Sequence, residues 1–150
     1  MAAASAWVPH DKFKEYAGDG TIDMDGDSFK IILCLSTSNI ATTSVDGYAA
    51  VTNEHATANG YTQGTKAIAS PTWVESSGTV TFDCADTVWT ASGGSITARF
   101  AAIYDDTVTT PVADPVVCDS LLDSAPADVT ATTTNTFTIT INASGVFDVA

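Results

Sequence analysis

The strongest candidate for metal chemistry in this chain is the acidic segment GDGTIDMDGDS, which contains Asp19, Asp23, Asp25 and Asp27. Carboxylate oxygens are hard ligands of the kind that Ca²⁺ takes in proteins. The spacing does not match an EF-hand loop, because Gly26 is displaced from the position of the sharp turn and no glutamate closes the loop. We therefore favour an exposed, turn-forming loop without a metal, and we leave calcium binding between these aspartates as the alternative.

The two histidines, His10 and His55, are the side chains to consider first as general bases. They are far apart in the sequence, and no second histidine completes a zinc-protease HExxH motif from Glu54 and His55. The chain contains no GxSxG, Walker or GxGxxG pattern. A Ser-His-Asp triad could be assembled only by choosing freely among many serines and aspartates, which carries no weight. The sequence therefore predicts a protein that is not an enzyme, with no catalytic residue, no metal and no cofactor.

Three cysteines, Cys34, Cys84 and Cys118, are widely spaced and odd in number. Their spacing does not match a zinc-binding pattern. We expect buried free thiols that pack as small apolar side chains. One disulfide with one remaining thiol is the alternative.

The charge of the chain argues against two classes of partner. Eighteen acidic and five basic residues give a formal net charge of −13, and such a surface repels nucleic-acid phosphates and anionic lipids. The N-terminus lacks the cationic start and apolar run of a secretory signal, and no window reaches the 18 apolar residues of a membrane span. We expect no nucleic-acid partner and no membrane partner.

Short strand patterns follow one another along most of the chain. Residues 29–36, FKIILCLS, are nearly all apolar and predict a strand covered on both faces. Residues 7–17 could form a short helix, whereas residues 37–64 form a long segment that is either functional or contains short hidden elements. Further strands are expected in TKAIAS, PTWVE, TVTFD, DTVWTA, SITARFAAIY, PVVCDSLLD, NTFTITIN and VFDVA, with PTWVE and TVTFD joined as a hairpin.

A second hairpin is predicted at Gly93-Gly94, because both glycines accept positive φ. In this register Trp89 faces Ala98, and Arg99 lies opposite Val88 on the outer face, where an aspartate could pair with it. The side chains expected to point inward are Trp89, Ile96, Ala98, Phe100 and Tyr104 from this hairpin, with Phe137 and Ile139 from NTFTITIN.

The number and spacing of these strands predict the fold class. Seven or more short strands with frequent turns and little helix are typical of an antiparallel β-sandwich, either immunoglobulin-like or jelly-roll. We expect a single domain over residues 1–150 with an N-terminal arm over about residues 1–28. Removal of residues 1–17 is expected to leave the sandwich folded.

The chain resembles a family of small tailed-phage and prophage virion proteins in four segments. These segments are FKEYAGDGTIDMDGDSFKIILCLS, TNEHATANGYTQGTKAIAS, TVTFDCADTVWTASGGSITARFAAIYDD and TFTITINASGVF. The resemblance implies a structural component of a phage particle, made in the host cytoplasm and carried on the virion, and it implies no catalytic residue.

Within a virion, a compact sandwich suits a capsid decoration (cement) protein that binds the outer shell and bridges major capsid subunits. A tail, fibre or adaptor component is the alternative. We expect the major capsid protein and further copies of this chain, as a homotrimer, to be its partners. The expected contact surface is the less acidic part of the chain, namely the N-terminal segment and residues 36–64, through the aromatic residues Trp7, Phe13, Tyr16, Tyr48 and Tyr61.

Overall fold

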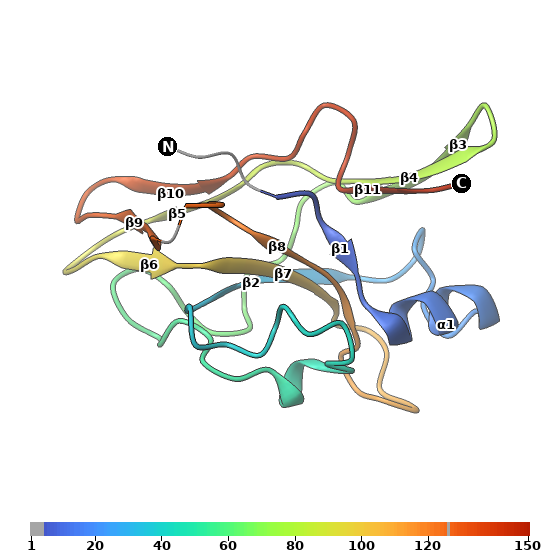
Figure 1. Ribbon diagram of the computed structural model, residues 1–150, viewed down its shortest axis with the longest axis horizontal. Helices are drawn as coiled ribbons and strands as arrows, with labels where there is room; N and C mark the ends of the chain where they lie inside the picture. The colour runs from blue at the N-terminus through green and yellow to red at the C-terminus, as the bar shows by residue number, and fades with distance from the viewer. Residues whose placement is uncertain (1–4, 126) are drawn as a thin grey trace.

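The computed structural model describes residues 5–125 and 127–150, and antiparallel strands supply most of their regular structure (Figure 1). One α-helix of nine residues, α1, lies near the start of the chain. The elements in chain order are β1 (Val8–Pro9), α1 (Asp11–Asp19), β2 (Phe29–Cys34), the 3-10 helix η1 (Tyr48–Ala50), β3 (Thr72–Ser76), β4 (Thr79–Asp83), β5 (Thr87–Thr90), β6 (Ile96–Ala98), β7 (Phe100–Asp105), β8 (Val116–Leu121), β9 (Val129–Ala131), β10 (Thr136–Ile139) and β11 (Phe147–Val149).

The strands form one four-stranded sheet and three smaller ones. The four-stranded sheet has the order β1-β8-β7-β2, and the smaller sheets are β11-β4-β3, β10-β5 and β6-β9. All the paired strands are antiparallel. In Figure 1, β10, β5, β4, β11 and β3 run along the upper side, and β7 and β2 lie below them. The prediction of an all-β, antiparallel, sandwich-like fold is confirmed, although several small sheets replace two large ones.

Strand β2 is covered on both faces, as its apolar sequence predicts. Phe29, Ile31 and Leu33 face the main core between the layers, whereas Ile32 and Cys34 face a second, smaller core. The second core lies between the four-stranded sheet and residues 36–51. Its buried members are Ile32, Cys34, Ile40, Val45, Ala102, Tyr104 and Val116.

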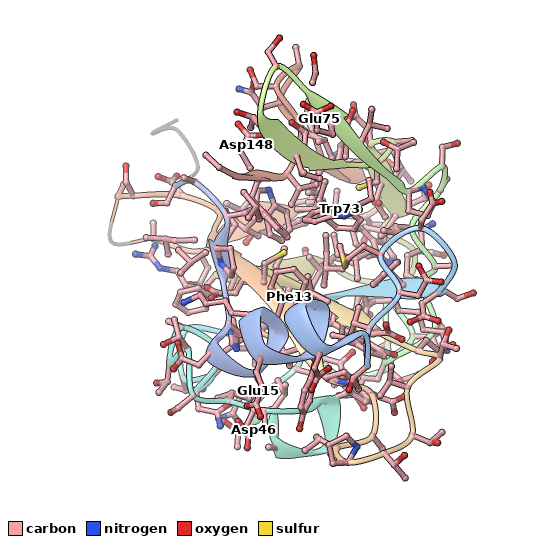
Figure 2. All side chains as sticks on the ribbon, turned by 90° about the vertical axis from the view of Figure 1, so that its right-hand side faces the viewer. Phe13, Glu15, Asp46, Trp73, Glu75 and Asp148 are labelled. Carbon is pink, nitrogen blue, oxygen red and sulfur yellow. The ribbon has the colours of Figure 1, made fainter. Side chains whose placement is uncertain are left out.

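Residues 5–28 are part of the folded domain and do not form a free arm. Val8 pairs with Asp119 across β1 and β8, and helix α1 buries Phe13 and Tyr16 in the main core. Figure 2 shows Phe13 pointing from the helix toward the interior, while Glu15 points away from it. The Phe13 ring lies edge-on to Phe147 at a centroid separation of 5.3 Å. The predicted short helix is present, but deletion of residues 1–17 would remove two aromatic side chains from the core.

The predicted hairpin at Gly93-Gly94 is wrong. Strand β5 pairs with β10, with Trp89 opposite Phe137, and β6 pairs with β9. Gly94 serves a close approach instead, because a Cβ there would lie 2.4 Å from the side-chain oxygen of Asn59. Asn59 also donates a hydrogen bond to the Ser95 carbonyl over 2.9 Å, so this link fastens the long segment to the sheet.

The alternation of side chains between the two cores shifts by one position at Arg99, between β6 and β7. Ala98 and Ala101 both belong to the main core, whereas Phe100 and Tyr104 pack against the second core. A single irregular residue between β6 and β7 thus moves the alternation by one position, as a bulge does. The prediction that Phe100 and Tyr104 share a face with Trp89 is therefore wrong, while Trp89, Ile96, Ala98, Phe137 and Ile139 are buried in the main core as predicted.

Arg99 has partners other than those expected. Its guanidinium donates to the backbone carbonyls of Ala125 and Ala127, and no aspartate among the described residues pairs with it. It also does not face Val88, which lies opposite Thr138. Arg99 therefore closes the loop between β8 and β9.

The remaining strand predictions have mixed outcomes. β3 and β4 form the expected hairpin, in which Ser76 pairs with Thr79 and the two loop residues, Ser77 and Gly78, have φ of 56° and 86°. Positive φ at both positions is the geometry that suits a two-residue hairpin loop. Residues 65–70 do not form a strand, and a single bridge joins Ala67 to Lys30 of β2.

Candidate functional site

Residues 36–64 form a long covering segment over the outer face of the four-stranded sheet. Besides the short helix η1, the segment is held by isolated bridges and by buried side chains. Ile40 and Val45 enter the second core. Backbone hydrogen bonds also attach the segment to β2, because Leu35 N donates to Asn53 O and His55 N donates to Leu33 O. The predicted short hidden elements are therefore present in a segment that is fixed to the sheet.

The centre of this segment is a carboxylate, Glu54, that receives three hydrogen bonds. The Tyr48 hydroxyl donates to Oε2 over 2.7 Å, and the Tyr61 hydroxyl donates to Oε1 over 2.6 Å. The backbone N–H of Gly64 donates to Oε1 over 3.0 Å. Hydrogen bonds to a charged acceptor are stronger than neutral ones, so this network joins three separate stretches of residues 48–64.

The same network reaches the sheet below. Leu33 N donates to the Tyr61 hydroxyl over 3.0 Å, and the Tyr104 hydroxyl donates to Gly64 O over 3.0 Å. The Tyr48 and Tyr104 rings stack with centroids 4.7 Å apart. Burial, reinforced by the Glu54 carboxylate, raises the pKa of Tyr48 and Tyr61. Both phenols therefore keep their protons and act as donors.

The structure places the five aromatic residues predicted for the contact surface differently from that prediction. Phe13, Tyr16 and Tyr61 are almost fully buried, so in this fold their side chains cannot reach a partner. Tyr48 is half-buried and bonded to Glu54, and Trp7 is half-buried beside the core. Phe13, Tyr16 and Tyr61 are therefore core residues in this fold. Burial of an aromatic side chain removes a large apolar area from water, so such residues are found more often in the core than on the surface.

What the covering segment does expose is uncharged. Every exposed residue between positions 36 and 64 is serine, threonine, alanine, asparagine, glycine or glutamine. Its acidic and histidine residues, Asp46, Glu54 and His55, are all partly buried. We call this set of exposed residues the uncharged face. It contrasts with a chain whose net charge is −13.

His10 is a buried structural clamp. Its side chain is fully buried, with Nδ1 3.0 Å from Val45 O and Nε2 3.0 Å from Asp119 Oδ1. The Val45 carbonyl can only accept, so Nδ1 donates to it, while Nε2 lies within hydrogen-bond distance of the Asp119 carboxyl group. His10 ties the start of α1 to β8 and to the covering segment.

His55 makes no hydrogen bond to His10 among the described residues. Its ring lies edge-on to Tyr61, and Nε2 is buried without a hydrogen-bond partner among the described residues. Burial lowers the pKa of His55, against an opposing effect of Glu54. In residues 5–125 and 127–150, neither imidazole is hydrogen-bonded to a serine, threonine or cysteine side chain. In those residues the geometry therefore brings no serine, threonine or cysteine side chain together with a histidine base.

The acidic loop uses its carboxylates on its own backbone. Asp23 Oδ1 accepts from the N–H groups of Asp25 and Gly26, both over 3.1 Å, and Asp27 Oδ2 accepts from Asp23 N over 2.8 Å. Asp19 accepts from Thr21 N. Where the chain is described, no three acidic, histidine or cysteine side chains are grouped to hold a metal ion. These contacts are typical of a turn-forming loop.

A buried carboxyl group, Asp105, lies at the end of β7 beside this loop. Asp105 is fully buried, and its Oδ1 accepts from Thr107 N over 2.7 Å and from Val108 N over 3.1 Å. Its Oδ2 has no hydrogen-bond donor among the described residues. Burial, with a further contribution from the neighbouring Asp27, raises the pKa of Asp105 to about 6. Asp105 follows the apolar run of β7, and this position is the one indication in the sequence that it could be buried.

The three cysteines are buried and unpaired, as the favoured prediction has it. Burial raises the pKa of Cys34 and Cys84 to about 12 and that of Cys118 well above its ordinary value. The thiolate is the reactive form of cysteine. These side chains therefore pack as small apolar groups at neutral pH.

Comparisons with family models, curated proteins and solved structures found no match to this chain. Among the helices of the described residues, none has the length and apolarity needed to cross a bilayer. The function must therefore be argued from the fold and from the surfaces it presents.

Proposed function

We propose that this protein is a non-enzymatic structural protein of a phage virion, most specifically a capsid decoration protein that binds the outer shell and bridges major capsid subunits. The resemblance of the four sequence segments to virion proteins motivates the proposal. The observation that carries it is the uncharged face, whose backbone is hydrogen-bonded to the sheet in a molecule of net charge −13.

Two properties of the uncharged face support a role in protein contact. Charged residues are depleted at the centre of protein interfaces, because their desolvation is costly. Small side chains on a fixed backbone also lose little conformational entropy on binding. The Glu54 network and the bonds to β2 supply the fixed backbone. The acidic residues elsewhere would then face solvent and keep particles apart.

The partners proposed are the major capsid protein and two further copies of this chain. A closed trimer satisfies the contacts of every copy without open-ended growth. A trimer placed where three capsid subunits meet secures all of them at once. In this arrangement the small residues of the uncharged face contact the shell, in place of the buried aromatic residues that the sequence suggested.

The first experiment measures how many copies of the protein a virion of the encoding phage contains, relative to its major capsid protein. Hundreds of copies are expected for a decoration protein of a repeating shell. A count of only a few copies, located at the tail, would replace the decoration proposal with a tail, fibre or adaptor role.

The second experiment tests the uncharged face on capsids that lack the protein. Ala41 and Ala56 are exposed there, and the double variant Ala41→Glu/Ala56→Glu should bind at least about a hundredfold more weakly, since unpaired buried charge costs several kcal/mol. The matched control, Thr72→Glu/Val74→Glu, adds the same charge on exposed positions of β3 and should bind as the unmodified protein does. Equal binding of both variants would exclude this face as the contact.

A further inference from the structure

Strand β10 has an open edge beside a cleft. Within residues 5–125 and 127–150, β10 pairs with β5 and with no second strand. Along its other side runs a cleft of about 820 Å³, whose lining includes the consecutive residues 137–142. The opposite wall is formed by residues 5–7, which lead into the edge strand β1. The cleft thus separates two sheet edges.

The backbone groups that point into this open edge can be identified from the antiparallel ladder. Ala91 N donates to Asn135 O over 2.9 Å, which sets the phase of the pairing between β5 and β10. Hydrogen-bonded and non-hydrogen-bonded pairs alternate along such a ladder, so Phe137 and Ile139 direct their backbone groups to β5. Thr138 and Thr140 direct theirs away from it. Both threonines are exposed.

A comparison with β2 shows what an occupied edge looks like in this protein. β2 is also the last strand of its sheet, yet its free side is bonded to the chain that passes it. Ile31 N donates to Lys66 O over 2.9 Å, and Ile68 N donates to Phe29 O over 3.1 Å. In the described part of the chain, the outward groups of Thr138 and Thr140 have no equivalent partners. Unpaired edges of this kind are the sites at which another strand can add.

The side chains of the cleft define the chemistry of a strand that would fit. Trp7, Leu122, Val129 and Ile141 line it and are all partly exposed. The only ionisable residue among its described lining is Asp148, which has no basic partner there and accepts a hydrogen bond from Thr81. Apolar side chains therefore fit along the cleft. A basic group fits near Asp148, and an acidic one is disfavoured by the charge of the whole molecule.

We propose that this cleft binds an extended segment of a different polypeptide, which adds as a strand to the β10 edge. The strand would be about six residues long, matching residues 137–142. It alternates apolar and small polar residues, carries no acidic side chain and has a basic residue near Asp148. The inference concerns a different surface from the uncharged face and does not depend on the virion role.

The test uses the intact protein and a designed peptide, a blocked heptapeptide of alternating valine and threonine that ends in lysine. Hydrogen exchange should show unprotected amides at Thr138 and Thr140 in the free protein and protection of both when the peptide saturates. The same peptide with every backbone amide N-methylated should give no protection, because neither of its edges can donate to the ladder. This comparison needs no variant of the protein.

A variant then tests the edge itself. Thr138→Pro removes one outward N–H without removing a bond to β5, and proline is tolerated on such an edge. Calorimetry should show peptide affinity reduced at least about tenfold. Thr138→Val retains the N–H and should bind as the unmodified protein does. Protection of Thr138 and Thr140 in the free protein at low concentration would overturn the proposal, because the chain would then cover its own edge. Protection that appears with protein concentration alone would assign the edge to a second copy, and absence of peptide binding would also refute it.

Discussion

The substitution Asp105→Asn should stabilise the protein at neutral pH, although it removes a native carboxylate. Asp105 is fully buried beside Asp27, and its pKa is raised from the ordinary 3.8 to about 6, first by burial. A folded-state pKa above the unfolded value means that stability is present below about pH 4 and is lost as the pH rises toward 6. The asparagine cannot ionise, so the variant escapes this loss.

The size of the effect follows from the two pKa values. At 1.36 kcal/mol per pH unit, the difference between 3.8 and about 6 corresponds to about 3 kcal/mol at pH 7.5, and to well under 1 kcal/mol at pH 4. The native contacts remain possible in the variant. The asparagine Oδ1 can still accept from Thr107 N and Val108 N, and its amide can donate to Asp27.

The assay is urea unfolding of both proteins at pH 4, 5, 6 and 7.5, followed by tryptophan fluorescence. The informative quantity is the difference between the two unfolding free energies, since the other acidic residues affect both proteins alike. The control Asp106→Asn alters a more exposed neighbour that pairs with Lys30, and should change stability by less than about 1 kcal/mol. A difference that does not grow with pH, or a less stable Asp105→Asn at pH 7.5, would refute the reasoning.

Two further predictions concern the covering segment and the two cores. Glu54→Ala should lower the free energy of unfolding in urea by about 2–4 kcal/mol, because two phenols and one backbone N–H lose their acceptor. Tyr48→Phe removes one donor and should cost about 1 kcal/mol. Equal costs would show that Glu54 does not join the network. Phe82→Ala, at a fully buried site, should cost about 3–5 kcal/mol, and Phe100→Ala, at a partly buried site, should cost clearly less. The reverse order would contradict the assignment of Phe100 to the margin of the second core.

The sequence by itself determines the elements whose cause is local. The apolar run of β2 predicts a strand covered on both faces, and both cores confirm it. The alternation of Phe137 and Ile139 with threonines predicts their burial, which holds because side chains of a strand alternate whatever the partner strand is. The hairpin of β3 and β4 is equally local, since two adjacent residues supply the turn.

The tertiary structure alone decides which strands pair and which polar groups meet. Trp89 pairs with Phe137 and not with Ala98, because packing selects among strands with similar patterns, and Gly94 is needed for the approach of Asn59. Glu54 meets its partners, and His10 meets Asp119 from 109 residues away, only because the tertiary fold brings these segments together. The local sequence spacing does not predict these contacts. Packing in the assembled fold also buries Phe13, Tyr16 and Tyr61, which the sequence suggested for an interface. It leaves the small uncharged residues of 36–64 on the surface, because only the assembled sheet determines which side of a long segment is inside.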